Sequence, residues 1–326
     1  MVIDTHAHII VPEITLEAAP EEEWRPHVYW EEGKQIVKYA GRQIRSAIWD
    51  FVQIEAILKA QDQAGVDRIL LAPWVTLLRY DAPPKEGLRI SRIQNEGLSK
   101  IAQAYQDRVS VLGTIPLQDA KLAASELEQL MSLPGMKGVE IASSVNGTFL
   151  GDEQFKPFWA AAEEHGALVF IHPTTRGFSA PVFNEFYMWN TVGNPLETTI
   201  TAAHMINAGI METFPGLKVI LAHGGGAILS LWGRLTHGHS FQPQAKSVLK
   251  ESPEASLKRF YFDTVVHAPE ILQTLINFAG PDHVMVGSDY PFDMGVARPA
   301  EVVGELGLPS SEEEKILSGN ALRLMG

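Results

Sequence analysis

The stretch that decides the fold is residues 1–10, MVIDTHAHII. Val2 and Ile3 predict a short buried strand, and the period of two in a strand places His6 and His8 on the same face. Imidazole is the commonest protein ligand of transition metals, so two imidazoles that converge on one point favour a metal site. Two histidines at this spacing also occur by chance, so the rest of the chain must decide.

The composition limits the kind of site that is possible. The chain has 326 residues, 45% of them hydrophobic, which suits one large α/β domain or two ordinary ones. It has no cysteine, so disulfides and thiolate metal sites are excluded. A metal ion must therefore be held by His, Asp or Glu.

The net charge and the hydropathy limit the partners. A formal charge of −13 repels nucleic acid and anionic membranes, so neither is an expected partner. No apolar run could span a bilayer and no leader pattern opens the sequence, so we expect a cytoplasmic protein. An anionic small-molecule substrate would need a few local Arg or Lys residues to hold it.

Strand-like and helix-like segments alternate along the chain. Runs such as 168–171 and 219–222 are continuously apolar, which is typical of strands buried on both faces of a parallel sheet. No GxGxxG follows the first strand, which argues against a dinucleotide-binding sheet. Eight such units predict a (β/α)₈ TIM barrel with helices closing the chain. The expected strands are residues 2–8, 68–72, 109–115, 138–142, 167–171, 218–222, 259–262 and 283–286.

Residues 11–48 interrupt this rhythm with a polar, aromatic segment of no clear period. Connections of this length in compact domains are usually functional. We therefore expect a single barrel domain over residues 1–326, with residues 11–48 as an inserted segment or lid after the first strand.

Polar residues follow the ends of four expected strands. His6 and His8 end the first, and His172, His223 and Asp289 directly follow three later apolar runs. A single buried histidine is usually structural. In a barrel, however, the carboxyl ends of all strands open at one mouth, where active sites lie. The five side chains are therefore expected to converge on one site.

Four motifs resemble those of a known family. They are DTHAH at residues 4–8, IHP at 171–173, AHGGG at 222–226 and GSDYPF at 287–292. Across essentially the whole chain, the sequence resembles the amidohydrolase superfamily. The similarity is to its branch of 2-amino-3-carboxymuconate-6-semialdehyde decarboxylase and related metal-dependent aromatic-acid decarboxylases.

The resemblance implies one divalent metal ion, usually Zn²⁺, with a water molecule completing its shell. It assigns the ligands to His6, His8, His172 and Asp289, and an acid/base role to His223. Three neutral imidazoles and one carboxylate leave such a site positively charged, which lowers the pKa of bound water toward about 7. A free His223 and the carboxylate of Asp289 are then suited to move or accept a proton.

The fourth expected strand bears on the number of metal ions. Binuclear members of the superfamily use a carbamylated lysine there, whereas this strand reads GVEIA and has none. The resemblance therefore implies one ion. Glu140, in the same strand, is the residue that could support a second.

Basic residues bear on the substrate. The resemblance implies that Lys38, Arg42 and Arg234 hold substrate carboxylates, with Arg234 reaching the neighbouring subunit's site in a homodimer. An arginine fork matches a carboxylate, although most Lys and Arg are solvated surface charges. The aromatic segment 178–189, which includes Trp189, suits a flat conjugated acid.

Three functions remain open on these observations. The first is non-oxidative decarboxylation of an unsaturated or aromatic carboxylic acid by metal-bound water and an acid/base histidine. The second is metal-dependent hydrolysis of an amide, lactone or related bond. The third is ligand binding without turnover, against which the complete ligand set argues. Release of carbon dioxide distinguishes the first two.

Overall fold

The structure is a computed structural model that describes residues 1–16, 27–32, 34–39, 42–45 and 51–326. Its centre is a parallel sheet in the order β1-β5-β6-β7-β10-β11-β12-β13. The strand bounds are β1 Ile3–Ile9, β5 Arg68–Pro73, β6 Val109–Gly113, β7 Met136–Ala142, β10 Leu168–His172, β11 Lys218–Leu221, β12 Tyr261–Asp263 and β13 Val284–Met285. Each overlaps one expected strand.

Hydrogen bonds between the two edges close this sheet into a barrel. The Asp289 backbone N–H donates to the His6 carbonyl at 2.8 Å, and the His8 N–H donates to the Tyr290 carbonyl at 2.8 Å. The segment that follows β13 therefore pairs with β1. Closure confirms the predicted (β/α)₈ barrel and excludes an open doubly wound sheet.

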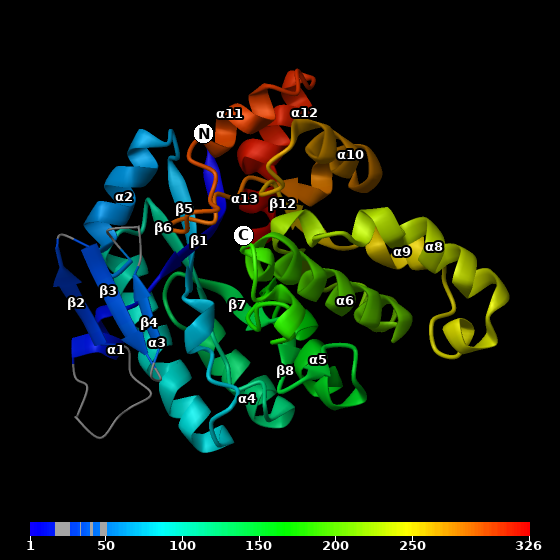
Figure 1. The fold of residues 1–326 in the computed structure, drawn as a ribbon, viewed down its shortest axis with the longest axis horizontal. Helices are drawn as coiled ribbons and strands as arrows, with labels where there is room; N and C mark the ends of the chain where they lie inside the picture. The colour runs from blue at the N-terminus through cyan, green and yellow to red at the C-terminus, as the bar shows by residue number, and fades with distance from the viewer. Residues whose placement is uncertain (17–26, 33, 40–41, 46–50) are drawn as a thin grey trace.

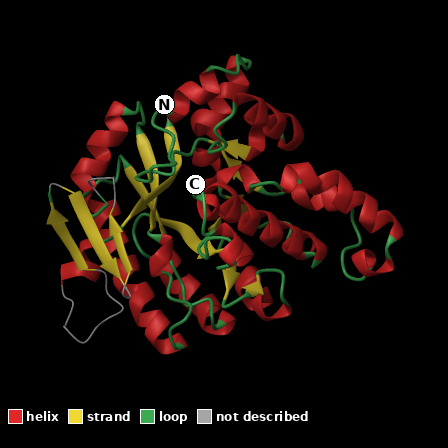
Figure 2. Cartoon of the chain, in the orientation of Figure 1, coloured by secondary structure: helices red, strands yellow, loops and turns green. Residues whose placement is uncertain are grey.

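Helices surround the barrel and close the chain (Figures 1 and 2). Gly209 takes a φ of +66°, which separates α6 from α7. The bounds are α2 Ile54–Gln63, α3 Pro84–Ala104, α4 Ala120–Met131, α5 Lys156–Glu164, α6 Asn194–Asn207, α7 Ile210–Thr213, α8 Ile228–Phe241, α9 Pro253–Leu257, α10 Pro269–Ala279, α11 Pro299–Gly304, α12 Ser310–Glu314 and α13 Asn320–Met325.

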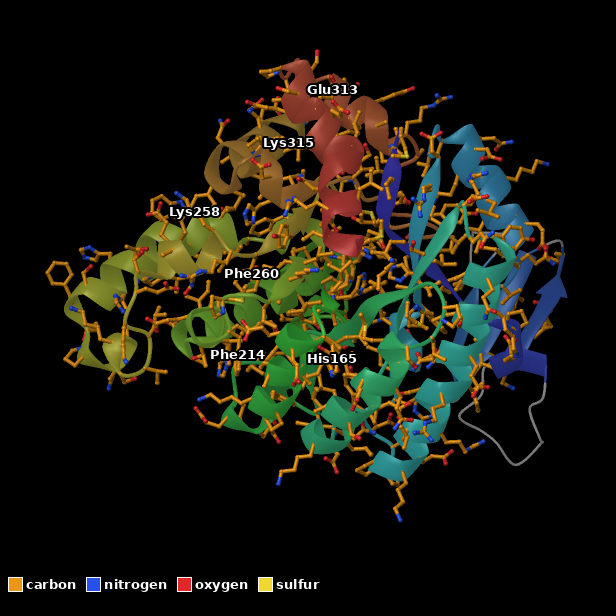
Figure 3. All side chains as sticks on the ribbon, turned by 180° about the vertical axis from the view of Figure 1, so that it is seen from behind. His165, Phe214, Lys258, Phe260, Glu313 and Lys315 are labelled. Atoms are coloured by element: carbon orange, nitrogen blue, oxygen red, sulfur yellow. The ribbon has the colours of Figure 1, made fainter. Side chains whose placement is uncertain are left out.

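The strands are buried on both faces. One apolar cluster lies inside the barrel and includes Ile3, Leu112 and Phe170. A larger cluster packs the outward-facing side chains of the strands against the helices. This double burial explains the continuous apolar runs in the sequence. Seen from behind, Lys315 lies on the closing helices (Figure 3), and its ammonium bonds Asp282 at 3.0 Å.

The inserted segment holds more regular structure than its sequence indicates. A short helix, α1 (Pro12–Leu16), precedes an antiparallel sheet of β2 (His27–Glu31), β3 (Lys34–Tyr39) and β4 (Arg42–Arg45), which lies beside the barrel in Figure 1. The expectation of no regular period is wrong for these strands. The rest of the expected lid, residues 17–26, 33, 40–41 and 46–48, lies outside the described residues.

Within the described part of the chain, no helix is both long and apolar enough to cross a membrane.

Candidate metal centre

β1 carries the first two histidines to the carboxyl end of the barrel. His6 and His8 are both buried, and their ring centroids lie 5.1 Å apart. Their Nε2 atoms lie 3.1 Å and 3.4 Å from Oδ1 of Asp289. The predicted convergence of a strand-one pair on one point is therefore present in the structure.

Two further strands complete this cluster. His172 ends β10, and its Nε2 lies 3.9 Å from the same Oδ1 of Asp289. Asp289 follows β13 with a φ of +57°, a conformation that L side chains rarely adopt outside functional sites. Three imidazole nitrogens and one carboxylate oxygen thus face one another.

These four atoms lack ordinary partners. The Nε2 atoms of His6, His8 and His172 and the Oδ1 of Asp289 are buried and accept no hydrogen bond from any described residue. Buried polar atoms are nearly always satisfied, because an unsatisfied one is costly. Converging, unpartnered nitrogen and oxygen donors are what a divalent cation satisfies, so the residues present fit a metal ion.

The outer nitrogens of the same rings orient them. Nδ1 of His6 bonds Oδ2 of Asp263 at 2.7 Å, and Nδ1 of His172 bonds the Pro173 carbonyl at 2.9 Å. For His8 the acceptor is a backbone carbonyl at 3.3 Å. An Nδ1–H that donates outward leaves the Nε2 lone pair pointing inward, as in known metal sites.

Burial and charge set the protonation of this cluster. Burial lowers the pKa of His8, and it lowers the pKa of His172 to about 3. Burial raises the pKa of Asp289, but the charge of His6 outweighs it, together with the hydrogen bond from His223, and holds that pKa well below its usual range. Burial lowers the pKa of His6, but the charge of Asp289 and the hydrogen bond to Asp263 outweigh it and raise that pKa well above its usual range. Neutral imidazoles at His8 and His172 beside an ionised carboxylate are in the state that binds metal, and a bound cation would take the place of the proton on Nε2 of His6.

His223 lies at the edge of the same cluster. It begins a short turn, η5 (His223–Gly225), and its Nε2 lies 3.4 Å from Oδ2 of Asp289, the oxygen that does not face the other histidines. Its side chain is 16% exposed, more than the other members. Ligand atoms of His6, His172, His223 and Asp289 lie within 4.8 Å of one another, so His223 is also close enough to be a ligand.

Asp263 is a site residue that the sequence reasoning missed. It ends β12, where its carboxylate accepts hydrogen bonds from Nδ1 of His6 at 2.7 Å and from the backbone of His223 and Gly224 at 2.9 and 2.8 Å. Burial raises its pKa, but the hydrogen bond and charge of His6 lower it below the ordinary value. Asp263 could have been predicted from the sequence, because it is a further polar residue at the end of a strand.

Asp4 was also missed as a residue that positions the site. Its carboxylate accepts hydrogen bonds from the backbone N–H of Ser288 at 3.0 Å and from Nε2 of Gln61 at 3.0 Å. The hydroxyl of Ser288 donates to it as well. Asp4 thereby ties β1 to the segment that carries Asp289.

Glu140 lies on the far side of His8 from the unpartnered atoms. Its Oε2 is 3.4 Å from Nδ1 of His8, and both of its oxygens are buried with no hydrogen-bond partner among the described residues. Burial raises the pKa of Glu140 well above its usual range, which favours the neutral acid.

The four residues predicted to bind substrate belong to other elements than those that carry the metal cluster. Lys38 is exposed on β3, Arg234 is exposed on α8, and only the backbone of Arg42 is described, in β4. Trp189 begins η4 (Trp189–Gly193), a single π-helical turn, where the guanidinium of Arg176 lies 4.3 Å from its ring centroid. The substrate roles of these residues stay predictions.

A pocket of about 210 Å³ opens beside His223 and Asp289. It lies between the loop after β12, the start of α6 and the loop after Asp289. Its other described lining residues are Asn190, Thr191, Asn194, Pro195, Gly226, Val265, Val266, His267, Ile271 and Met294. It joins the metal cluster to solvent and is the natural place for a substrate.

Glu197, a third missed residue, holds the loop that follows His172. It is fully buried on α6 and accepts hydrogen bonds from the backbone of Thr174, Thr175 and Gly177, the last at 2.6 Å. The hydroxyl of Ser143 also donates to it, at 2.8 Å. One carboxylate thus fixes the β10 loop against the barrel.

Comparison with known proteins agrees with this geometry. The amidohydrolase family model matches residues 3–326. A 2-amino-3-carboxymuconate-6-semialdehyde decarboxylase of Dictyostelium discoideum is 31% identical over 288 residues, covering 87% of this chain and 79% of the relative. A 6-methylsalicylic acid decarboxylase of Penicillium expansum is 29% identical over 241 residues, covering 72% of this chain and 74% of the relative.

Among solved structures, 5-carboxyvanillate decarboxylase of Novosphingobium aromaticivorans, complexed with manganese and 4-hydroxy-3-methoxy-5-nitrobenzoic acid, superposes with a TM-score of 0.82. It is 21% identical and covers 100% of this chain and 96% of its own. The chain belongs to the amidohydrolase family, in the branch that contains 2-amino-3-carboxymuconate-6-semialdehyde decarboxylase and aromatic-acid decarboxylases. The relatives confirm the predicted enzyme class, a carboxy-lyase.

Proposed function

We propose that this enzyme is a metal-dependent, non-oxidative decarboxylase of an unsaturated or aromatic carboxylic acid. The observation that carries the proposal is the convergence of three unpartnered imidazole nitrogens and one carboxylate oxygen next to a pocket that Asp289 and His223 line. The relatives support the reaction, because those reported above are decarboxylases named for conjugated or aromatic acids.

His6, His8, His172 and Asp289 would hold one divalent ion. Three nitrogens and one oxygen suit Zn²⁺, the expected ion, and the manganese in a structural neighbour makes Mn²⁺ the alternative to test. When bound, the ion supplies a Lewis acid that polarises substrate oxygens and lowers the pKa of water. Hydrogen bonds from the Nδ1 atoms to Asp263 and to the Pro73 and Pro173 carbonyls fix the orientation of the three histidine rings.

His223 would move the proton. Its Nε2 faces both Asp289 and the pocket, and its Nδ1 is buried with no hydrogen-bond partner among the described residues. In the proposed step, a proton from His223 adds to the carbon that carries the carboxylate. The bond to the carboxylate then breaks, carbon dioxide leaves, and its electron pair restores the conjugated system.

We further propose a homodimer that completes the substrate site. Arg234 is exposed on α8, which extends away from the barrel in Figure 1, so it is better placed for a partner than for its own centre. If Arg42 acts in its own chain, a mixture of Arg42→Ala and Arg234→Ala subunits recovers about one quarter of the native rate after random exchange. No recovery after demonstrated exchange contradicts the shared site.

The test of the reaction is a screen of unsaturated and aromatic carboxylic acids with the Zn²⁺-loaded and the Mn²⁺-loaded protein. We expect carbon dioxide release together with a change in ultraviolet absorbance. A product that has gained water without loss of carbon dioxide would instead identify a hydrolase.

A further inference from the structure

Three polar side chains line the pocket in addition to those of the metal cluster, and we refer to the three together as its polar wall. Asn190 lies in η4 and Asn194 begins α6, while His267 comes from the loop between β12 and α10. None of the three side chains makes a hydrogen bond to a described residue. They are therefore available to a molecule in the pocket.

The backbone of His267 lies in the left-handed region. Of the eleven described non-glycine residues with a positive φ, three line this pocket, namely His223 at +55°, His267 at +58° and Asp289 at +57°. Non-glycine residues in this region are uncommon, and they cluster at binding and catalytic sites because the surrounding structure must hold them there. The strained backbone places the His267 imidazole at the pocket.

Most of the remaining lining is apolar. Val265, Ile271 and Met294 contribute hydrophobic surface to the pocket. A flat ring or chain can lie against these side chains with its carboxylate toward His223 and Asp289. A substituent on the ring then meets the polar wall.

We propose that Asn190, Asn194 and His267 select the substrate by binding a neutral oxygen substituent, a hydroxyl or carbonyl group, on the acid. Amide and imidazole groups each offer a donor and an acceptor, which a hydroxyl group matches. A second carboxylate is instead matched by an arginine fork. This inference rests on the proposed function, because it assumes that the pocket holds a carboxylic acid.

Binding measurements test it without requiring turnover. The probes are benzoate, the three monohydroxybenzoates and isophthalate, titrated calorimetrically into the Mn²⁺-loaded protein. We expect the best hydroxybenzoate to bind about three- to tenfold more tightly than benzoate, and isophthalate to show no such gain. Asn190→Leu and His267→Gly should each remove most of that preference while leaving the benzoate affinity within about twofold.

The variants are chosen to keep the fold. Glycine accepts the positive φ at position 267, and Asn190 is only half-buried. His237→Ala is the matched control, because His237 is exposed on α8 and does not line the pocket. It should keep the full preference.

The outcomes separate the two proposals. If wild-type protein binds benzoate and the hydroxybenzoates equally, or if both pocket variants keep the preference, the polar wall does not select the substituent and this inference is overturned. If isophthalate binds best, the wall selects a carboxylate, which also overturns it. If no aromatic acid binds, this inference is overturned for aromatic acids, whereas the proposed function fails only if the screen for carbon dioxide release finds no unsaturated or aromatic substrate.

Discussion

The ends of β1, β12 and β13, here called the seam, and the polar wall of the pocket are built differently. Along the seam, Asp4 and Asp263 are buried and accept several hydrogen bonds each, so they support the residues of the metal cluster. In the polar wall, Asn190, Asn194 and His267 line the pocket without side-chain hydrogen bonds to described residues. The hydrogen-bonded seam is suited to the reaction that the branch shares, and the polar wall is suited to distinguishing one substrate from another.

The largest effect is expected where the seam meets the metal cluster. Asp289→Ala removes the only carboxylate among the proposed ligands, so the protein should lose its divalent ion, expected at about one per chain, and its activity. Elemental analysis of purified protein measures this. Asp293→Asn, an exposed carboxylate in the same loop, is the control and should keep the ion. Two ions in the wild-type protein would contradict the single site.

The His223→Ala variant tests whether His223 takes part in the reaction or holds the metal ion. His223→Ala should keep the metal ion and lower turnover by about two to four orders of magnitude, the usual share of general acid/base catalysis. Metal content and rate are measured on the same sample. Loss of the ion would make His223 a ligand, and a near-normal rate would remove it from the mechanism.

Asp263 tests how much the seam contributes from behind the ligands. Asp263→Asn removes the charge that orients the His6 ring, so metal affinity should fall by about 10- to 100-fold. A chelator competition assay gives the affinity. Asp107→Asn, at an exposed carboxylate, is the matched control. An unchanged affinity would mean that the backbone alone orients the ring.

Glu197 tests how much the fixing of the β10 loop contributes to stability. Glu197→Gln replaces a buried carboxylate that accepts several backbone N–H groups, so the free energy of unfolding should fall by about 1–3 kcal/mol. Chemical denaturation measures the loss. The metal content should be unchanged, as it should be in Glu164→Gln, an exposed control on α5 that is expected to keep full stability.

The smallest effect is expected at the outer rim. The Tyr187 hydroxyl donates to Asp293 at 3.1 Å and joins the β10 loop to the β13 loop, but the side chain is 37% exposed. Tyr187→Phe should therefore change KM by less than about threefold and leave kcat unchanged. A change of tenfold or more would show that the rim takes part in closing the site.

The sequence alone determined the barrel and the metal cluster. Apolar runs on a regular βα rhythm predicted each barrel strand, because strands buried on both faces leave a continuous pattern. His6, His8, His172, His223 and Asp289 were found because polar residues that directly end such runs must share the barrel mouth. Asp263 also directly follows an expected strand, but it was not predicted as a site residue.

Only the tertiary structure decided what surrounds this cluster. Asp4 bonds Ser288, 284 positions away, and Glu197 bonds Ser143, 54 positions away. Bonds between residues so far apart in the chain leave no local pattern in the sequence. The antiparallel strands of the insertion were also hidden, because a sheet beside the barrel need not follow the apolar rhythm of its core. Likewise, the pocket wall of Asn190, Asn194 and His267 depends on loops from separate elements, whose meeting is set by closure of the barrel.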